Sequence, residues 1–283
     1  MNSHFRRPPV TSLLCLLAFA QVLAEEPVSA PQPAAKPKPV EFDETAKKVF
    51  EAWEQKAYNL GRAGVKKATV NIKAKLSHPK LPAPLGCTGT FTWDEAAEGE
   101  NGKLAYSDAA AGEKAAGEMA VGAMLMAQGW NAKSLSAQYD PENLRKALAG
   151  TVLKAETIGE RTFLKVQGKA ADGTSELVFD KDGVLDEMGL SIPTAQGTAL
   201  EVRFKILTKK EGETYLPAGW TYVLDLPGQG KVASTVTITT AKAGAYHVWS
   251  KVEERVLMNE RVIGGAELEF SEYKFNEEVK GKE

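Results

Sequence analysis

Apolar and polar residues alternate with a period of two over much of this 283-residue chain. Val70, Ile72 and Ala74 alternate with polar residues, which is typical of a strand with one buried face. Residues 87–93 repeat the pattern, and an Asn-Gly pair at 101–102 indicates a turn into a further short strand. The pattern predicts neighbouring strands in this part of the chain.

The C-terminal half continues the alternation from residue 151 to residue 276. Turn pairs separate its strands: Asp172-Gly173, Asp182-Gly183, Glu211-Gly212, Pro227-Gly228, Ala243-Gly244 and Gly264-Gly265. The clearest apolar stripe consists of Leu200, Val202, Phe204 and Ile206. Short connections place successive strands side by side and antiparallel, and the polar side of each strand predicts a sheet with one wet face.

The segment that follows residue 42 has helical spacing instead. Phe50 and Trp53 fall on one face of a helix that Asp43 or Thr45 can cap. We expect this amphipathic helix to end near the glycines at 61 and 64. Its aromatic residues are interpreted as core.

The segment before the C-terminal half interrupts the strand pattern. Residues 112–130 are rich in Ala, Gly and Met, with apolar positions almost all round a helix. A second helix is predicted over residues 141–149, because Asp140 can cap it and Pro141 suits its first turn. We therefore expect a helical insert over residues 112–149.

This order of elements predicts an α+β fold. We expect a large curved antiparallel β-sheet with the N-terminal helix and the helical insert packed on its concave face. We expect a single domain over residues 42–276, followed by a charged tail at 277–283. The alternative is a pair of β domains that divide near Gly197.

The N-terminus has the pattern of a secretory signal peptide. Residues 1–24 combine Arg6 and Arg7 with an apolar run that ends in Ala24. The run is shorter than the roughly 20 residues that span a bilayer, so we predict cleavage and no stable membrane insertion afterwards. Residues 25–41 follow as a proline-rich disordered linker. The mature protein is expected to be periplasmic or secreted.

Charge and cysteine content narrow the classes of partner. The formal net charge is −2 and the two signs are interspersed, so no broad basic patch attracts nucleic acid or an anionic membrane surface. Cys87 is the only cysteine outside the signal peptide. We therefore expect no disulfide within the chain, and we interpret Cys87 as a small buried hydrophobic residue.

No catalytic or metal-binding pattern is found. His78 and His247 lack nearby ligand residues for a metal, and we interpret both as surface or loop histidines. Residues 180–183 fit a hairpin turn better than a calcium loop. The acid pairs at 186–187 and 253–254 place neighbouring carboxylates on opposite faces of a strand, which favours solvation over acid–base chemistry. We expect no enzymatic activity and no cofactor, and an enzyme of unrecognised type is the remaining alternative.

The remaining candidates for a functional role are apolar. A curved sheet that faces helices can enclose a hydrophobic cavity, and methionine adapts to ligands of variable shape. The predicted ligand-binding residues, which share large apolar side chains, are Phe91, Trp93, Met119, Met124, Met126 and Phe204. The alternative is that they form an ordinary core.

Three short motifs in the strand-rich half of the chain resemble motifs of a known protein family. They occupy residues 177–183 (LVFDKDG), 215–217 (YLP) and 268–276 (LEFSEYKFN). In element order and in these motifs the chain resembles the periplasmic lipoprotein-carrier superfamily, which includes LolA-like and outer-membrane lipoprotein-sorting proteins. The resemblance implies an unclosed barrel whose concave face holds acyl chains, with a lipid or an acylated protein as partner. It assigns no individual ligand-contact residue.

Two functional hypotheses result. The first is an exported binding protein that holds a hydrophobic ligand, a lipid or a lipoprotein acyl chain, between the sheet and the helices. The second is an exported structural or protein-interaction domain with a filled core. A cavity lined by methionine and aromatic side chains would distinguish the first hypothesis from the second. Ligand identity and oligomeric state do not follow from the sequence.

Overall fold

The computed structural model describes residues 38–77, 79, 84–94, 102–106, 141–168, 170, 173–193, 199–226 and 230–276. Its helices in this part of the chain are α2 (Glu44–Lys56) and α4 (Pro141–Ala147). The first strands are β1 (Glu41–Phe42), β2 (Lys67–Ser77), β3 (Leu85–Asp94), β4 (Gly102–Tyr106), β5 (Val152–Ile158) and β6 (Arg161–Gln167). The later strands are β7 (Thr174–Phe179), β8 (Leu185–Pro193), β9 (Ala199–Glu211), β10 (Thr214–Leu226), β11 (Gly230–Ala243), β12 (Tyr246–Met258) and β13 (Arg261–Phe275).

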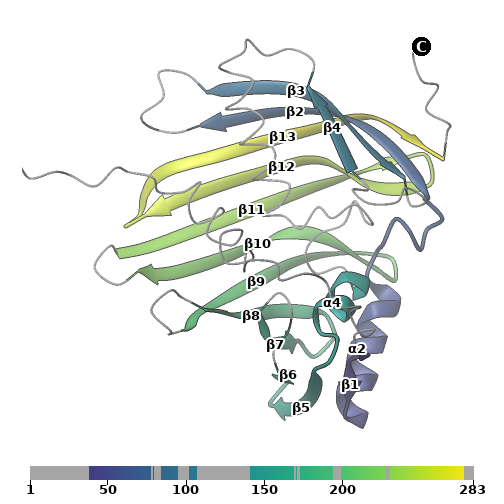
Figure 1. Ribbon diagram of the computed structural model, residues 1–283, viewed down its shortest axis with the longest axis vertical. Helices are drawn as coiled ribbons and strands as arrows, with labels where there is room; N and C mark the ends of the chain where they lie inside the picture. Colours follow the sequence, from purple (N-terminus) through teal and green to yellow (C-terminus); the bar gives the residue numbers. More distant parts are fainter. Residues whose placement is uncertain are drawn as a thin grey trace, which may run out of the picture.

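The strands form one open sheet in the order β1-β5-β6-β7-β8-β9-β10-β11-β12-β13-β2-β3-β4. Figure 1 shows it as a single curved layer, with α2 and α4 near β5, β6 and β7. Consecutive strands from β5 to β13 pair as antiparallel neighbours, which the short turns predicted. Only the two-residue β1 pairs in parallel among the described strands, with Glu41 opposite Val152. The predicted antiparallel sheet is confirmed.

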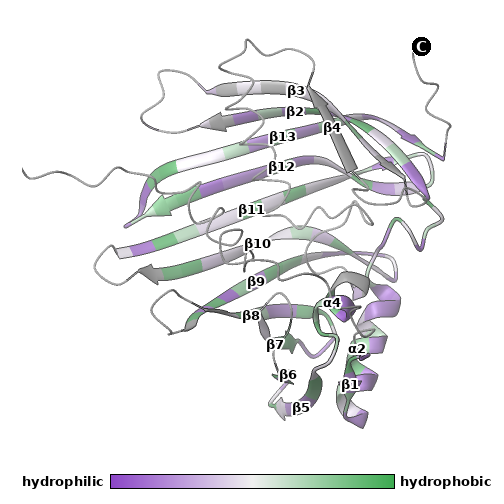
Figure 2. Cartoon of the chain, viewed as in Figure 1, coloured by the Kyte–Doolittle hydropathy of each residue, from purple (hydrophilic) through white to green (hydrophobic). Residues whose placement is uncertain are grey.

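One face of the sheet holds the apolar core, and we call it the inner face. Figure 2 shows hydrophobic and hydrophilic residues in succession along the long strands. The residues on the inner face of the long strands include Val202, Phe204, Ile206, Trp220, Tyr222, Leu224, Val232, Ser234, Val236, Val252, Glu254, Val256, Ala266, Leu268 and Phe270. Most of them are buried, whereas Glu201, Arg203 and Lys205 on the other side of β9 are exposed. The predicted apolar stripe on this strand is confirmed.

Helix α2 packs its aromatic face against the inner face of the sheet. The Asp43 carboxylate caps the helix by accepting a hydrogen bond from the Ala46 N–H at 2.7 Å. The buried ring of Phe50 contacts that of Trp53, and Trp53 contacts Phe179 on β7 with ring centroids 5.9 Å apart. Phe50 and Trp53 therefore belong to the core, as the sequence predicted.

The helix ends earlier than the expected glycines at 61 and 64. Ala57 is already extended and forms an isolated bridge with Tyr215 on β10. The guanidinium group of Arg62 donates hydrogen bonds to the carbonyl oxygens of Glu54 and Ala57. Pairing with the sheet and this side-chain cap therefore end the helix one turn before a glycine is reached.

Helix α4 begins at Pro141, where the cap pattern predicted it, and buries Leu144. Its Arg145 forms a two-point ion pair with Glu54 of α2, with N–O distances of 2.7 Å and 2.6 Å, and lies over the Phe50 ring at 5.0 Å. The two described helices therefore form one unit at one end of the sheet. The helix expected over residues 112–130 lies outside the described residues.

The outer face of β6, β7, β8 and β9 carries a network of ion pairs. Its members are Arg161, Lys165, Glu176, Asp186, Glu187, Arg203 and Lys205. Arg161 binds both Asp186, at 2.8 Å, and Glu187, at 2.7 Å. The prediction of opposite faces for these two acids is therefore wrong, because the pairing with β7 shifts register between Val178 and Phe179.

Strand β1 begins at Glu41, inside the segment predicted as linker. Strands β8 and β9 pair with each other, so the strands on both sides of Gly197 belong to one sheet. The signal peptide and the tail at 277–283 lie outside the described residues. Neither described helix is long and apolar enough to span a bilayer.

Candidate functional site

The inner face continues far beyond the two helices. Helices α2 and α4 lie near β5, β6 and β7 (Figure 1), whereas buried apolar side chains extend to Ile72 on β2 and Phe91 on β3. A second, smaller apolar cluster consists of Val202, Leu224, Val232 and Val256. This broad apolar surface is the part of the described chain with the character of a hydrophobic ligand site.

The structure brings two of the predicted site residues onto this face. Phe91 is buried, and Phe204 is partly buried and packs against both apolar clusters. Five strands separate β3 from β9 in the sheet, so the two rings lie roughly 30 Å apart along the sheet. They belong to one surface and not to one compact pocket. Met119, Met124 and Met126 and the side chain of Trp93 lie outside the described residues.

A polar cluster interrupts the apolar surface between its two parts. It consists of Tyr222 on β10, Ser234 on β11 and Glu254 on β12, and we call it the inner-face polar cluster. Ser234 is directly opposite Tyr222, is 1% exposed, and donates a hydrogen bond to the Glu254 carboxylate at 3.0 Å. The Tyr222 ring also contacts the Phe204 ring, with centroids 5.1 Å apart.

The surroundings of the cluster shift its ionisation. Burial raises the pKa of the Glu254 carboxyl above its ordinary value of 4.5, and the hydrogen bond from Ser234 opposes this rise. Burial, together with the negative charge of Glu254, raises the pKa of Tyr222 to about 12. The free energy of unfolding therefore has a contribution from Glu254 that is fully present below the ordinary pKa and is lost as the pH rises through the raised one.

This cluster is not among the predicted site residues, and both acids of the pair at 253–254 are predicted from the sequence to be solvated. The two carboxylates do lie on opposite faces of the strand, as predicted: Glu253 is exposed and pairs with Lys251 at 2.9 Å. Glu254 lies on the inner face, so the prediction of solvation is wrong for Glu254. The alternation already contained the signal, because Val252 and Val256 lie two residues before and after Glu254 and are both buried.

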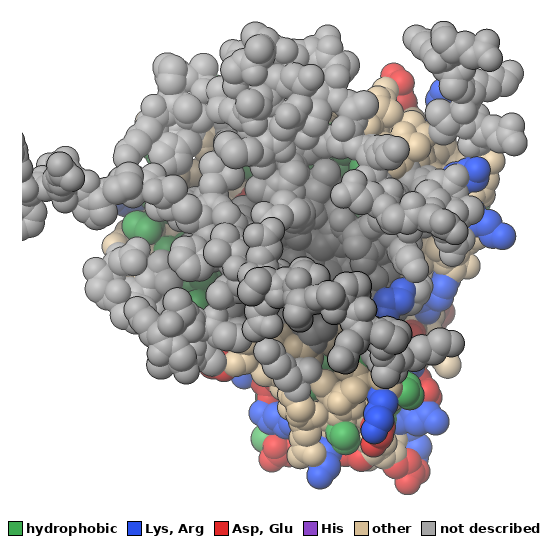
Figure 3. All heavy atoms as spheres, in the orientation of Figure 1, with side chains coloured by type: hydrophobic (Ala, Val, Ile, Leu, Met, Phe, Trp, Pro, Cys, Tyr) green, Lys and Arg blue, Asp and Glu red, His purple; other side chains and the backbone are tan. Residues whose placement is uncertain are grey.

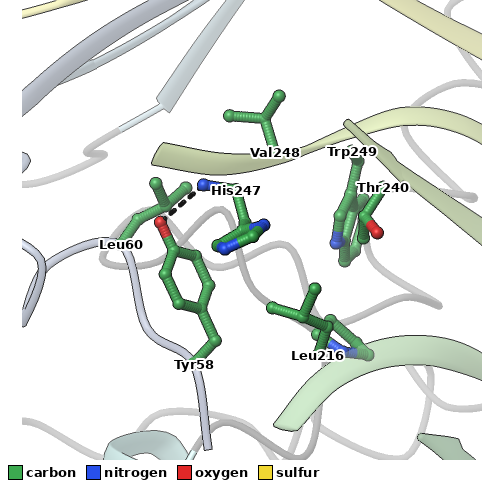
Figure 4. A pocket seen from close by; sticks show the side chains of 8 residues that line it. Tyr58, Leu60, Leu216, Thr240, His247, Val248 and Trp249 are labelled. Carbon is green, nitrogen blue, oxygen red and sulfur yellow. Dashed lines mark hydrogen bonds between the residues drawn. The ribbon is translucent and has the colours of Figure 1, made fainter. Parts of the chain in front are cut away.

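A small cavity lies elsewhere, at the end of β12 near α2. It is lined by Tyr58, Leu60, Leu216, Pro217, Thr240, His247, Val248 and Trp249, as Figure 4 shows. Its volume of about 20 Å³ accommodates one water molecule. This cavity is therefore too small for a lipid or any comparable ligand.

His247 helps to close this cavity. The Tyr58 hydroxyl accepts a hydrogen bond from the His247 backbone N–H at 2.9 Å, and the two rings meet edge to face. His247 is thus a partly buried strand residue, and its interpretation as a surface or loop histidine is wrong. His78 lies outside the described residues. Those residues contain no cluster of three or more His, Cys, Asp or Glu side chains that could bind a metal ion.

Charged side chains of both signs are interspersed on the described surface. In the view of Figure 3, Lys, Arg, Asp and Glu side chains alternate over the end of the molecule that contains α2 and β5. No patch of one sign dominates the described part of this view, which is the distribution expected from the sequence.

Comparison with known protein families found no match to this sequence. A search of curated proteins likewise found no relative. Among solved structures, the chain is similar to a LolA superfamily protein from Nitrosomonas europaea, with 8% identity, a TM-score of 0.31, and coverage of 82% of this chain and 94% of that one. It is also similar to a DUF1329 family protein from Desulfovibrio piger, with 5% identity, a TM-score of 0.37, and coverage of 83% and 94%. At these TM-scores, neither likeness assigns a fold family or a function to this chain.

Proposed function

We propose that this chain is an exported binding protein that holds the hydrophobic part of a ligand, a lipid or a lipoprotein acyl chain, on the inner face of its sheet. Export follows from the signal-peptide pattern of residues 1–24. Binding is non-enzymatic, and the apolar surface contributes the binding energy through burial.

The observation that carries the proposal is the extent of the inner face. Its apolar side chains span the sheet from β7 to β3, while the two described helices lie near β5, β6 and β7 (Figure 1), and Lys56 at the end of α2 reaches Tyr215 on β10. An aliphatic chain laid across β9 to β13 meets side chains such as Phe204, Val256 and Leu268. These side chains are largely buried in the structure, so a ligand must replace the contacts that bury them.

One observation favours the second hypothesis, an interaction domain with a filled core. The cavity at Tyr58 and His247 is small, and Val252 and Leu268 on the inner face are fully buried. If no ligand replaces these contacts, the inner face has the structural role of a hydrophobic core and binds no ligand. The experiment below separates the two functions.

The test uses native mass spectrometry and a fluorescence titration on the chain from Glu25 onward. The probe is a pyrene-labelled dodecanol, whose head group is uncharged. We expect saturable binding, and we expect Phe204→Ala to weaken it about tenfold through the loss of apolar contact. The matched control is Val223→Ala, because Val223 lies on the outer face of the adjacent strand and is 61% exposed.

Each outcome decides between the hypotheses. Copurified lipid, or probe binding that Phe204→Ala weakens and Val223→Ala leaves unchanged, supports the carrier. A protein that yields no lipid and takes up no probe refutes it and leaves the interaction domain.

A further inference from the structure

Glu254 is an acid on an apolar surface. Its neighbours on β12 are Val252 and Val256, and the residues opposite it are Val236 on β11 and Ala266 on β13. All four are buried. A carboxylate in such surroundings is costly unless a cation or several hydrogen bonds compensate its charge.

The described residues supply only part of that compensation. Ser234 donates one hydrogen bond to Glu254, and no described Lys, Arg or His lies within ion-pair distance of its carboxylate. Other acids nearby do have cations: Glu253 pairs with Lys251 at 2.9 Å, and Glu267 lies 3.5 Å from the same amine. Among the described residues, Glu254 therefore has one hydrogen-bond donor and no cation beside it on the inner face.

Ser234 and Tyr222, the other two members of the cluster, have hydroxyl groups that can accept hydrogen bonds from an amine. An ammonium group donates three hydrogen bonds. The carboxylate of Glu254 and the hydroxyl groups of Ser234 and Tyr222 are three oxygen acceptors on adjacent strands. Apolar side chains of the two clusters lie on either side of them, with Val236 on one side and Val232 on the other.

We propose that the inner-face polar cluster binds the cationic amine head group of an amphiphile whose alkyl chain lies on the apolar part of the inner face. This inference rests on the proposed function, because it assigns the head group of the same ligand. Glu254 neutralises the ammonium charge, while Ser234 and Tyr222 accept its remaining hydrogen bonds.

The proposal has a pH dependence with a definite sign. Burial raises the pKa of Glu254, so its carboxylate becomes neutral earlier than usual as the pH falls. The amine then loses its counter-charge, and its affinity falls. Among the described residues, the other titratable group of the cluster is Tyr222, two strands away on β10, and its pKa of about 12 keeps it neutral in this range.

The experiment compares dodecylamine with dodecanol by isothermal titration calorimetry. Both probes carry the same chain, so their ratio of affinities isolates the head group. We expect the wild-type chain at pH 8 to bind the amine at least about tenfold more tightly than the alcohol. In Glu254→Gln this preference disappears, and Ser234→Ala reduces it by about threefold. Lowering the pH stepwise from 8 weakens amine binding by the wild-type chain, as its Glu254 carboxylate is protonated, but not by Glu254→Gln.

Glu253→Gln is the matched control, because it removes the same charge one residue away on the outer face. It must keep the preference for the amine. Circular dichroism establishes whether each variant folds. If Glu254→Gln does not fold, Ser234→Ala is the variant that tests the proposal.

The failures can be told apart. If neither probe binds the wild-type chain, the proposed function fails and this inference fails with it. If both probes bind with equal affinity, or if Glu253→Gln abolishes the preference as well as Glu254→Gln, only the head-group assignment is overturned.

Discussion

Replacement of Gly219 by Ala should destabilise the protein by about 4 kcal/mol. Gly219 has a φ of +131° and lies at the register shift of β10. A Cβ atom there overlaps the carbonyl oxygen of Val236 and comes within 3.2 Å of the Thr237 Cα. Because Gly219 pairs with β9 on one side and β11 on the other, neither neighbour can move away without disturbing the sheet. Denaturant unfolding followed by circular dichroism measures the change.

The control for this variant is Gly212→Ala in the turn of the same hairpin. Gly212 also has a positive φ, of +62°, but a Cβ atom added there meets no other atom within 4 Å. It should therefore lose only about 1 kcal/mol, the backbone part of the effect. Equal losses for both variants would show that the close approach of β10 and β11 at Gly219 does not exist.

Replacement of Phe50 by Ala should reduce the free energy of unfolding by about 3–5 kcal/mol. Phe50 is fully buried, and its ring contacts the rings of Phe42 and Trp53 at 5.3 Å and 5.5 Å. The ring also supports the Arg145 guanidinium group, which joins α4 to α2. Loss of the ring leaves a cavity between the helix pair and the sheet. The same denaturant measurement applies.

Lys48→Ala provides the comparison on the same helix. Lys48 is exposed, and among the described residues it pairs only with Glu44, one helical turn away, so its loss should change stability by less than about 0.5 kcal/mol. A similar small change for Phe50→Ala would mean that α2 does not pack on the sheet as described.

The alternation of residues predicted most of the sheet. Leu200 to Ile206 form the inner stripe of β9, and the turn pairs, such as the one at 211–212, join antiparallel neighbours. The hydrophobic effect alone accounts for this success, because one buried face requires a period of two. The alternation of residues does not reveal where the register between two strands shifts. The shift near Val178 places Asp186 and Glu187 on the same side of β8.

The candidate site was less predictable than the fold. Phe91 and Phe204 were correctly placed on the apolar face, but their distance along the sheet depends on strand order, which alternation does not contain. Glu254 was missed for a different reason. Its charge suggested exposure to solvent, whereas its position between Val252 and Val256 suggested the inner face, where the structure places it half-buried. An acid at an apolar position of a strand pattern is therefore worth treating as a candidate functional residue.

In the proposed function, the inner face of β9 to β13 holds the hydrophobic part of a ligand. Photo-cross-linking with a diazirine-bearing long-chain alcohol, followed by residue-level mass spectrometry, tests it most directly, because an uncharged head group leaves Glu254 out of the result. We expect adducts on inner-face residues such as Phe204, Tyr222 and Val256, and we expect excess unlabelled alcohol to suppress them. Adducts confined to outer-face residues such as Val223, or labelling that competitor does not suppress, would contradict it.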